Sequence, residues 1–190
     1  MKTTLDIQSR LSTDCIGHPI LAYESVSSTN DVLKDLALQG APEGTTVVAQ
    51  SQSKGRGRRG REWVSTSGKG VLLSVLLRPG VPGADAGLMA ILGGVSVVRA
   101  LETLEVGKLA LKWPNDVLAG GRKIAGVLVE PRIGAGLIEF AVVGIGINVA
   151  QAAADWTDAL KETATSCHME GVLVSREHVT RAVLSEMDYW

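Results

Sequence analysis

The chain has 190 residues, of which 45% are hydrophobic and 21% are charged, and its formal net charge is −1 at pH 7. These values are typical of one compact domain with an apolar core, and they argue against a disordered chain. A protein without an excess of Lys and Arg is not expected to bind nucleic acid over its whole surface, so any anion site must be local.

Gly, Arg or Glu interrupts the apolar stretches before they reach the roughly 20 residues of a membrane span, so no transmembrane helix is predicted. The N-terminal segment contains no apolar run of the kind found in secretory signals, and we therefore expect a cytoplasmic protein. Cys15 and Cys167 belong to no CxxC pattern, which predicts reduced, structural thiols without a disulfide or a zinc site.

The first elements alternate between strand and helix. Ile20–Glu24 is predicted as a short strand, and polar residues at 27–31 cap a helix whose apolar residues recur at helical spacing as far as Ala37. Thr45–Ala49 is rich in β-branched residues and is predicted as a second strand. It leads directly into Gln50–Trp63, a segment without apolar periodicity.

The remaining elements predict one domain over residues 1–190. Val71–Leu77 is predicted as a buried strand and Asp85–Leu104 as the central buried helix. Further strands are expected at Leu109–Trp113, Asp116–Ala119, Arg122–Val129 and Leu137–Ile147, with turns at Gly120-Gly121 and Pro131–Gly136, and helices at Asp155–Glu162 and, capped by Ser175, at Arg176–Tyr189. Strands joined by short turns pair antiparallel. The predicted class is therefore α+β, with a mixed, mainly antiparallel central sheet flanked by helices.

The segment after the second strand, KGRGRRGREW at Lys54–Trp63, concentrates positive charge. Its five cations are separated by three glycines; the cations are Lys54, Arg56, Arg58, Arg59 and Arg61. Glycines allow close approach of the backbone, and guanidinium groups bind phosphate or carboxylate through paired hydrogen bonds. The pattern predicts a phosphate clamp, although a solvated loop or an RNA-binding segment has the same composition.

The same segment matches the dinucleotide-binding pattern at Gly55, Gly57 and Gly60. A nicotinamide-binding loop must open a helix with small apolar residues, and an acidic residue must follow about 20 residues later. Here the intervening residues are Arg, and residues 62–68 do not continue as a helix. Nicotinamide binding is therefore not favoured.

Two downstream motifs add groups that are able to act on an anion. Lys112-Trp113-Pro114-Asn115-Asp116 places a cation, an amide and a carboxylate at a strand break. Lys123-Ile124-Ala125-Gly126 places a Lys at the start of a strand, followed by small residues that leave room for a ligand. Each motif alone is also explained by an ordinary turn or an exposed Lys.

Taken together, five segments resemble the catalytic domain of biotin–protein ligases, whose fold is shared with lipoate ligases and with class II aminoacyl-tRNA synthetases. They are Ser28-Thr29-Asn30, Gln52 with Gly55–Trp63, KWPND at 112–116, KIAGVLVE at 123–130 and GIGIN at 144–148. Their order and spacing match, and the resemblance runs from Tyr23 to Asn148. It implies a biotin–[acetyl-CoA-carboxylase] ligase in a short form, without the family's N-terminal DNA-binding domain or its small C-terminal β-rich domain.

The resemblance implies a reaction in two steps. ATP, with Mg²⁺, adenylates the carboxylate of biotin and releases pyrophosphate, and a lysine of a biotin carboxyl carrier domain then attacks biotinyl-5'-AMP. Two anions meet in the first step, so preorganised cations must stabilise the charge on the phosphoryl oxygens. Relatives form dimers through edge strands, and the strand at Ala125–Glu130 is expected to pair in this way. No DNA or membrane partner is expected.

Site residues follow by similarity. Lys123, Arg56 and Asp116 are expected to be catalytic, and Asp116 is expected either to bind Mg²⁺ or to deprotonate the acceptor lysine. The biotin-binding residues implied are Ser28, Thr29, Asn30, Gln52, Gly55, Arg56, Gly57, Arg58, Lys123, Gly126 and Gly144. The residues implied for ATP or the adenylate are Arg58, Arg61, Trp63, Lys112, Asn115 and Asn148.

The reaction also predicts that the Arg/Gly loop moves, because an adenylate hydrolyses if water reaches it. A loop over residues 53–62 that closes on bound ligand would exclude water. Two other functions stay open on the sequence alone. One is a lipoate–protein ligase or octanoyltransferase of the same fold, and the other is a nucleic-acid-binding module built on the Arg/Gly loop.

Overall fold

The structure is a computed structural model that describes residues 7–190. The expectation that no secretory signal is present concerns residues 1–6 in part, and these lie outside the described residues. The predicted sheet is confirmed as a seven-stranded sheet in the order β1-β2-β3-β7-β6-β5-β4. Its strands are β1 (Ile20–Val26), β2 (Thr46–Gln52), β3 (Gly70–Leu77), β4 (Leu109–Lys112), β5 (Asp116–Ala119), β6 (Arg122–Gly134) and β7 (Leu137–Asn148).

The pairing is mixed and mainly antiparallel, as the sequence predicts. β1 and β2 are parallel because the helix α2 (Thr29–Leu38) crosses from one to the other. Each other pair of neighbouring strands is antiparallel. The glycines at the β5–β6 turn, Gly120 and Gly121, have φ values of 56° and 84°, which favour residues without a side chain.

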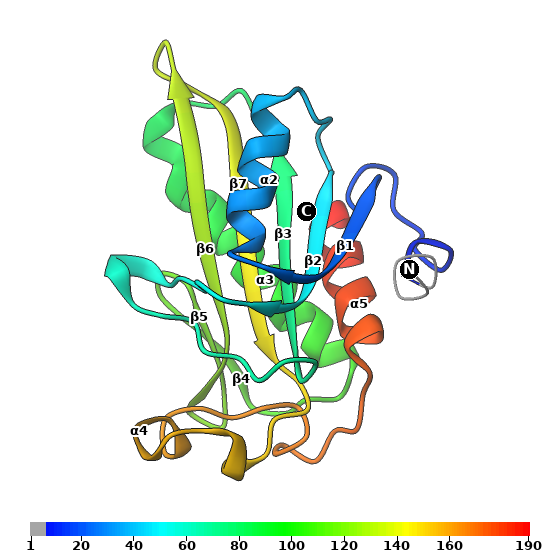
Figure 1. Ribbon diagram of the computed structural model, residues 1–190, viewed down its shortest axis with the longest axis vertical. Helices are drawn as coiled ribbons and strands as arrows, with labels where there is room; N and C mark the ends of the chain where they lie inside the picture. The colour runs from blue at the N-terminus through cyan, green and yellow to red at the C-terminus, as the bar shows by residue number, and fades with distance from the viewer. Residues whose placement is uncertain (1–6) are drawn as a thin grey trace.

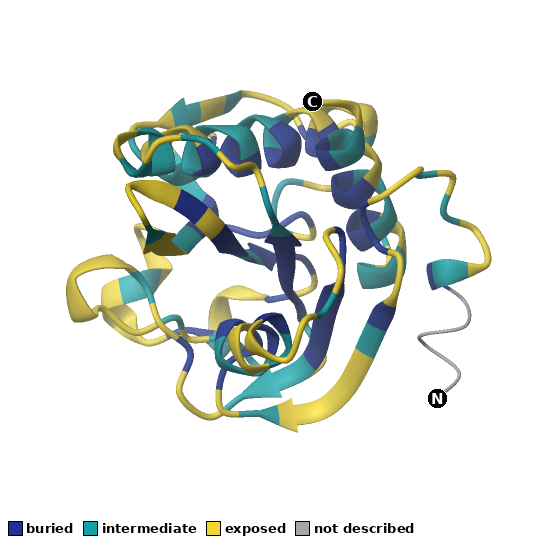
Figure 2. Ribbon diagram, turned by 90° about the horizontal axis from the view of Figure 1, so that it is seen from above, coloured by how far each residue is buried: buried dark blue, intermediate teal, exposed yellow. Residues whose placement is uncertain are grey.

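Helices cover the two faces of the sheet (Figure 1). α3 (Ala86–Thr103) and α5 (Arg176–Tyr189) pack on one face and α2 on the other, with the buried residues between the layers (Figure 2). The N-cap of α5 is confirmed, since the Ser175 hydroxyl accepts a hydrogen bond from the His178 N–H at 3.2 Å. A short helix, α4 (Asp158–Lys161), lies in the segment after β7.

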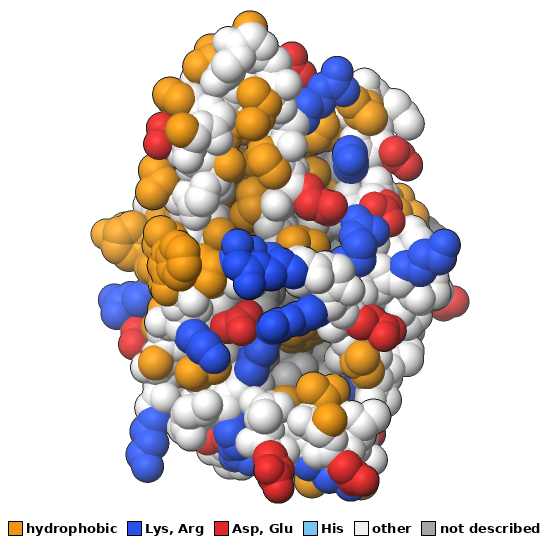
Figure 3. All heavy atoms as spheres, turned by 90° about the vertical axis from the view of Figure 1, so that its left-hand side faces the viewer, with side chains coloured by type: hydrophobic (Ala, Val, Ile, Leu, Met, Phe, Trp, Pro, Cys, Tyr) orange, Lys and Arg blue, Asp and Glu red, His pale blue; other side chains and the backbone are white. Residues whose placement is uncertain are grey.

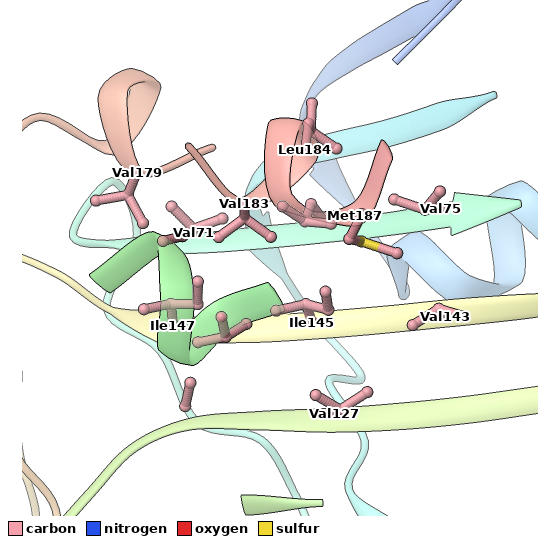
Figure 4. Close-up of a cluster of buried hydrophobic side chains, with 14 of the residues drawn as sticks. Val71, Val75, Val127, Val143, Ile145, Ile147, Val179, Val183, Leu184 and Met187 are labelled. Atoms are coloured by element: carbon pink, nitrogen blue, oxygen red, sulfur yellow. The ribbon is translucent and has the colours of Figure 1, made fainter. Parts of the chain in front are cut away.

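Side chains of β7 alternate between the two faces, and this alternation separates core from site. Val143, Ile145 and Ile147 point into the core beneath α3 and α5 (Figure 4). The intervening residues Gly144 and Gly146 therefore lie on the α2 face, because successive residues of a strand point to opposite faces. Where β7 carries glycine, that face has no side chain to fill the space above the sheet.

Two boundaries differ from the predictions. The turn expected at Pro131–Gly136 is wrong, because β6 continues through Pro131 to Gly134 and only Ala135 and Gly136 turn, with φ values of 50° and 81°. β5 pairs with β6 only as far as Gly126, so Pro131 lies where the outer side of β6 has no strand partner among the described strands. A sheet edge tolerates proline because no ladder hydrogen bond is lost there. The element predicted at Asp155–Glu162 is a 3₁₀ turn at Ala153–Asp155 followed by α4.

One helix is long and apolar enough to cross a membrane by length and composition alone. It spans Gly83–Thr103 with a mean hydropathy of 1.5, a length and composition that the sequence analysis did not single out. Its side chains Met89, Val97, Ala100 and Leu101 belong to the core against the sheet and α5. The central buried helix of a globular domain has the same composition.

Candidate functional site

A cavity of about 600 Å³ opens on the α2 face of the sheet. It lies between the N-terminus of α2, the Arg/Gly loop, the β4–β5 turn and the glycine-bearing parts of β6 and β7. Lys and Arg side chains gather near the middle of the side of the molecule on which β6 lies (Figure 3). The predicted site residues that line the cavity are Ser28, Thr29, Asn30, Gln52, Arg56, Gly57, Arg58, Arg61, Trp63, Lys112, Asn115, Asp116, Lys123, Gly126 and Gly144.

Glycines form the floor of the cavity and let two side chains lie directly on the sheet. A Cβ at Gly144 would overlap the Asn30 side chain, and one at Gly146 would overlap the Trp63 ring. A Cβ at Gly126 would lie 3.2 Å from both Lys123 Nζ and the Trp63 ring. Gly146 lies in the GIGIN segment but was not among the predicted site residues. Its position two residues after Gly144, on the same face of a strand, is the signal that identifies it.

A buried hydrogen-bond network fixes one end of the cavity. Gln52 Oε1 accepts from the Thr29 N–H at 2.7 Å and lies 3.0 Å from Thr29 Oγ1. Ser74 Oγ lies 2.7 Å from Thr29 Oγ1 and 2.6 Å from Asn30 Oδ1. Asn30 Nδ2 donates to Glu130 at 2.7 Å and to the Leu128 carbonyl at 3.4 Å.

This network occupies Thr29 and Asn30 but leaves two neighbours with free polar groups. Asn30 uses its oxygen and both N–H bonds within the protein, so it serves to hold its neighbours in place. Ser28 Oγ and Gln52 Nε2 have no partner among the described residues, and both side chains line the cavity. Sequence reasoning missed Ser74, whose only signal is a single hydroxyl within the apolar strand VLLSVLL.

Arg56 forms ion pairs with two carboxylates rather than standing free. Its guanidinium donates to Asp31 at 2.6 and 2.9 Å in a paired arrangement, and it lies 3.3 Å from both oxygens of Glu130. The hydrogen bonds from Arg56 lower the pKa of Asp31 below its ordinary value, although partial burial opposes the shift. Asp31 and Glu130 were not predicted. An acidic residue in the first turn of a helix also has a capping explanation, so sequence alone does not identify Asp31 as an arginine partner.

The opposite end of the cavity holds the groups of the KWPND and KIAG motifs. Lys123 Nζ lies 2.6 Å from Asp116 Oδ1 and 5.5 Å from the centre of the Trp63 ring, over the ring face. Asn115 Nδ2 donates to the Val127 carbonyl at 2.8 Å, and Asn115 Oδ1 lies 3.4 Å from an Arg58 nitrogen. The fold therefore brings the predicted catalytic pair Lys123 and Asp116 into direct contact.

The Arg/Gly loop is folded as a hairpin over this end. Arg56 and Glu62 form an antiparallel bridge, the Gly57 N–H donates to the Arg61 carbonyl at 2.6 Å, and the Trp63 N–H donates to the Gly55 carbonyl at 3.0 Å. The tip is a 3₁₀ turn at Arg58–Gly60. The indole Nε1 of Trp63 is buried without a hydrogen-bond partner. Movement of the loop on ligand binding stays a prediction.

Two predicted residues do not line the cavity. Asn148 is buried, and its Nδ2 donates to the Thr165 carbonyl at 2.9 Å while its Oδ1 accepts from Gln151 at 3.3 Å. It therefore holds the segment after β7 against the sheet. Gly55 lies at the root of the loop, where a Cβ would come 2.5 Å from the Trp63 carbonyl oxygen. Its missing side chain allows the hairpin to close.

Cys15 is an exposed free thiol and Cys167 a buried one. Burial raises the pKa of the Cys167 thiol to about 11, which keeps it protonated and unreactive at neutral pH. Within residues 7–190, no group of three or more His, Cys, Asp or Glu side chains is arranged to hold a metal ion. Mg²⁺ is usually bound through one or two carboxylates and substrate phosphates, and Asp116 is a carboxylate that such an arrangement needs.

Comparison with known proteins identifies the family. A model of the biotin/lipoate A/B protein ligase family matches residues 22–148. The chain belongs to this family. The family match confirms the resemblance found in the sequence, and its residue range contains the segments that carried it.

Named relatives point to the biotin branch of the family. The chain is 37% identical over 180 residues to a protein of Bacillus spizizenii named bifunctional ligase/repressor BirA. The matched region covers 94% of this chain and 55% of that protein. It is 36% identical to the biotin–[acetyl-CoA-carboxylase] ligase of Mycobacterium tuberculosis, over 85% of this chain and 59% of that protein. The chain thus spans somewhat more than half the length of these relatives.

Solved structures agree with the family and the fold. The biotin protein ligase of Aquifex aeolicus in complex with biotin and ATP matches 90% of this chain and 68% of that chain, with a TM-score of 0.74 and 34% identity. At this likeness the seven-stranded sheet and its flanking helices are those of a biotin protein ligase catalytic domain.

Proposed function

We propose that the chain is an ATP-dependent biotin–protein ligase. The observation that carries this proposal is the chemical asymmetry of one cavity. One end offers a few free hydrogen-bonding groups above a glycine floor, and the other end gathers the cations Arg58, Lys112 and Lys123. Biotin has a polar ring system at one end and a carboxylate at the other, so it matches the cavity along its length.

In the proposed first step, an oxygen of the biotin carboxylate attacks the α-phosphorus of ATP. The bond from that phosphorus to pyrophosphate breaks, and biotinyl-5'-AMP is formed. Both reactants are anionic, so cations at the meeting point lower the barrier by stabilising the developing charge. Lys123 is the best placed of these, because it lies over the face of the Trp63 ring and beside the floor at Gly126.

In the proposed second step, the amine of an acceptor lysine attacks the carbonyl carbon of the adenylate, and AMP leaves. The ammonium group of the acceptor must lose a proton before it attacks. Asp116 lines the cavity and is the proposed acceptor of that proton, or the protein ligand of Mg²⁺ carried by the ATP phosphates. The proposed acceptor is the carrier domain of a biotin-dependent carboxylase, and the use of ATP is consistent with the expected cytoplasmic location.

The test is incubation of the purified chain with ATP, Mg²⁺, biotin and a biotin carboxyl carrier domain, followed by intact mass measurement. A mass gain equal to one biotinyl group is expected, and none without ATP. A parallel incubation with lipoate and a lipoyl carrier domain tests the other branch of the family. Transfer of lipoate alone would contradict the proposal, and so would salt-sensitive binding of RNA that requires the Arg/Gly loop while no transfer occurs.

We also propose a homodimer through the outer side of β6. The predicted interface at Ala125–Glu130 needs correction, since Ala125 and Gly126 pair with β5 on this side. The unpaired part begins at Leu128 and extends to Gly134. Sedimentation velocity at rising concentration should show a monomer–dimer equilibrium, with protection of amides at 128–134 from hydrogen exchange in the dimer. A monomer at every concentration would contradict it.

A further inference from the structure

The ion pairs of Arg56 give this residue a role other than the one its place in a cationic loop predicts. Two carboxylates, Asp31 and Glu130, contact the one guanidinium, so the three side chains together carry a net charge of −1 rather than +1. The two carboxylates offset the positive charge of Arg56, so the group as a whole does not attract a phosphate. Arg58 and Arg61, further along the loop, form no ion pair with a carboxylate among the described residues.

The same carboxylates connect the loop to the end of the cavity where the proposed biotin ring binds. Asp31 is adjacent to Asn30 in the first turn of α2, and Glu130 accepts from Asn30 Nδ2 at 2.7 Å while it also contacts Arg56. Asn30 in turn contacts Ser74, which contacts Thr29. A continuous set of contacts therefore runs from Arg56, at the root of the loop, to the hydrogen-bond network around Thr29.

We propose that Asp31 and Glu130 are positioning residues that act through Arg56 to hold the root of the Arg/Gly loop beside the head-group end of the cavity. Neither carboxylate lines the cavity, so neither is expected to contact the ligand. The paired geometry between Arg56 and Asp31 fixes both distance and orientation, which a single-point contact does not. This proposal rests on biotin being the ligand of the cavity.

The two roles for Arg56 predict opposite patterns in binding experiments. If Arg56 positions the loop for the head group, loss of its partners weakens biotin binding in the absence of ATP and leaves the KM for ATP unchanged. If Arg56 neutralises phosphate, removal of the carboxylates frees its charge and lowers the KM for ATP, with biotin binding unaffected.

The experiment measures the Kd for biotin alone by isothermal titration calorimetry, and then the KM for ATP from pyrophosphate release. The variants are Asp31→Asn, Glu130→Gln and Arg56→Lys, because a lysine ammonium does not bridge both carboxylates in the paired geometry. Asp35→Asn is the matched control, since Asp35 lies on the same helix, is exposed and has no side-chain partner among the described residues.

We expect the Kd for biotin to rise about tenfold in each variant and to stay unchanged in the control. The double variant Asp31→Asn with Glu130→Gln should lose less than the product of the single losses, because both act through Arg56. Asp31→Glu, which keeps the charge, should recover most of the affinity. All proteins are compared only where their thermal midpoints agree, which separates positioning from unfolding.

Unchanged biotin affinity in all three variants, with an altered KM for ATP in Arg56→Lys, would overturn the inference and assign Arg56 to the phosphates. If the unmodified chain itself fails to bind biotin, the proposed function fails instead. The two failures are therefore distinguished by the first titration in the series.

Discussion

Two buried serines test the hydrogen-bond network, because only one of them has hydrogen-bond partners. Ser74 and Ser96 are both fully buried. The Ser74 hydroxyl lies 2.6 Å from Asn30 Oδ1 and 2.7 Å from Thr29 Oγ1, whereas the Ser96 hydroxyl has no hydrogen-bond partner. Substitution of each by alanine removes the same atom from a fully buried position, in the strand β3 for Ser74 and in the helix α3 for Ser96.

The expected effects on stability have different sizes and can have opposite signs. Ser74→Ala removes two contacts and leaves Asn30 Oδ1 buried without a donor, and an orphaned buried acceptor costs about 1–3 kcal/mol. We therefore expect the free energy of unfolding to fall by about 2 kcal/mol. Ser96→Ala removes a hydroxyl that is itself buried without a partner, so its stability should be unchanged or raised by up to about 1 kcal/mol.

Ligand binding should separate the two variants further. Asn30 and Thr29 share Ser74 as a partner, so both side chains lose a contact that holds them in place in Ser74→Ala. The Kd for biotin should therefore rise about tenfold. Ser96 lies on α3, on the other face of the sheet, and Ser96→Ala should bind biotin normally. Urea denaturation and calorimetry with biotin measure both effects. Equal losses of stability in the two variants would refute the reasoning from hydrogen-bond partners.

Three further predictions concern the reactive end, the floor and the acid stability of the chain. Lys123→Ala should reduce pyrophosphate release with biotin and ATP by roughly 100- to 1,000-fold while the thermal midpoint changes little, because its partly exposed ion pair with Asp116 contributes little to stability; undiminished release would remove the proposed role. Gly146→Ala should displace the Trp63 ring, which a Cβ would overlap, and should raise the Kd for biotinyl-5'-AMP about tenfold or more, as measured by a shift in tryptophan fluorescence on titration; Gly107→Ala, where a Cβ meets no atom within 4 Å, is the control. Burial raises the pKa of Asp188, but hydrogen bonds from the N–H groups of Ile16, Asp14 and Cys15 outweigh it and lower that pKa below 3.8. A carboxylate whose pKa is lower in the folded state than in the unfolded state stabilises the protein at pH values above the unfolded-state pKa, and this stabilisation is lost as the pH falls through the folded-state pKa. The stability of the wild type should therefore fall more steeply below about pH 4 than that of Asp188→Asn. Parallel acid-unfolding curves would contradict this prediction.

Local sequence patterns determined the order and type of most elements. The spacing of apolar residues distinguishes a helix from a strand, and this spacing is visible within a short stretch of neighbouring residues. The predicted strands over residues 71–77 and 116–119 agree with the structure to within a residue, and so does the cap at Ser175. The family resemblance rested on five segments, and the site residues predicted from them line one cavity, with the exception of Gly55 and Asn148.

Where the predictions failed, the deciding contact was distant in the sequence. Pro131 is a turn signal in isolation, and only its place on an unpaired sheet edge allows the strand to continue. Asn148 belongs to a family motif, but its side chain contacts Thr165 and Gln151 from the following segment. Neither the unpaired edge at Pro131 nor the contacts of Asn148 produce a repeating pattern of residues in the sequence.

The sequence by itself determined that cations, glycines and a carboxylate occur in a pattern suited to an anionic reaction. Only the tertiary structure decided which charges remain available for it. Arg56 and Arg58 are two residues apart in one loop, yet Arg56 is paired with Asp31 and Glu130 while Arg58 lies at the cavity near Asn115. The physical reason is that a residue's chemical type is local, whereas the free charge it presents depends on partners that the sheet and α2 bring from elsewhere in the chain.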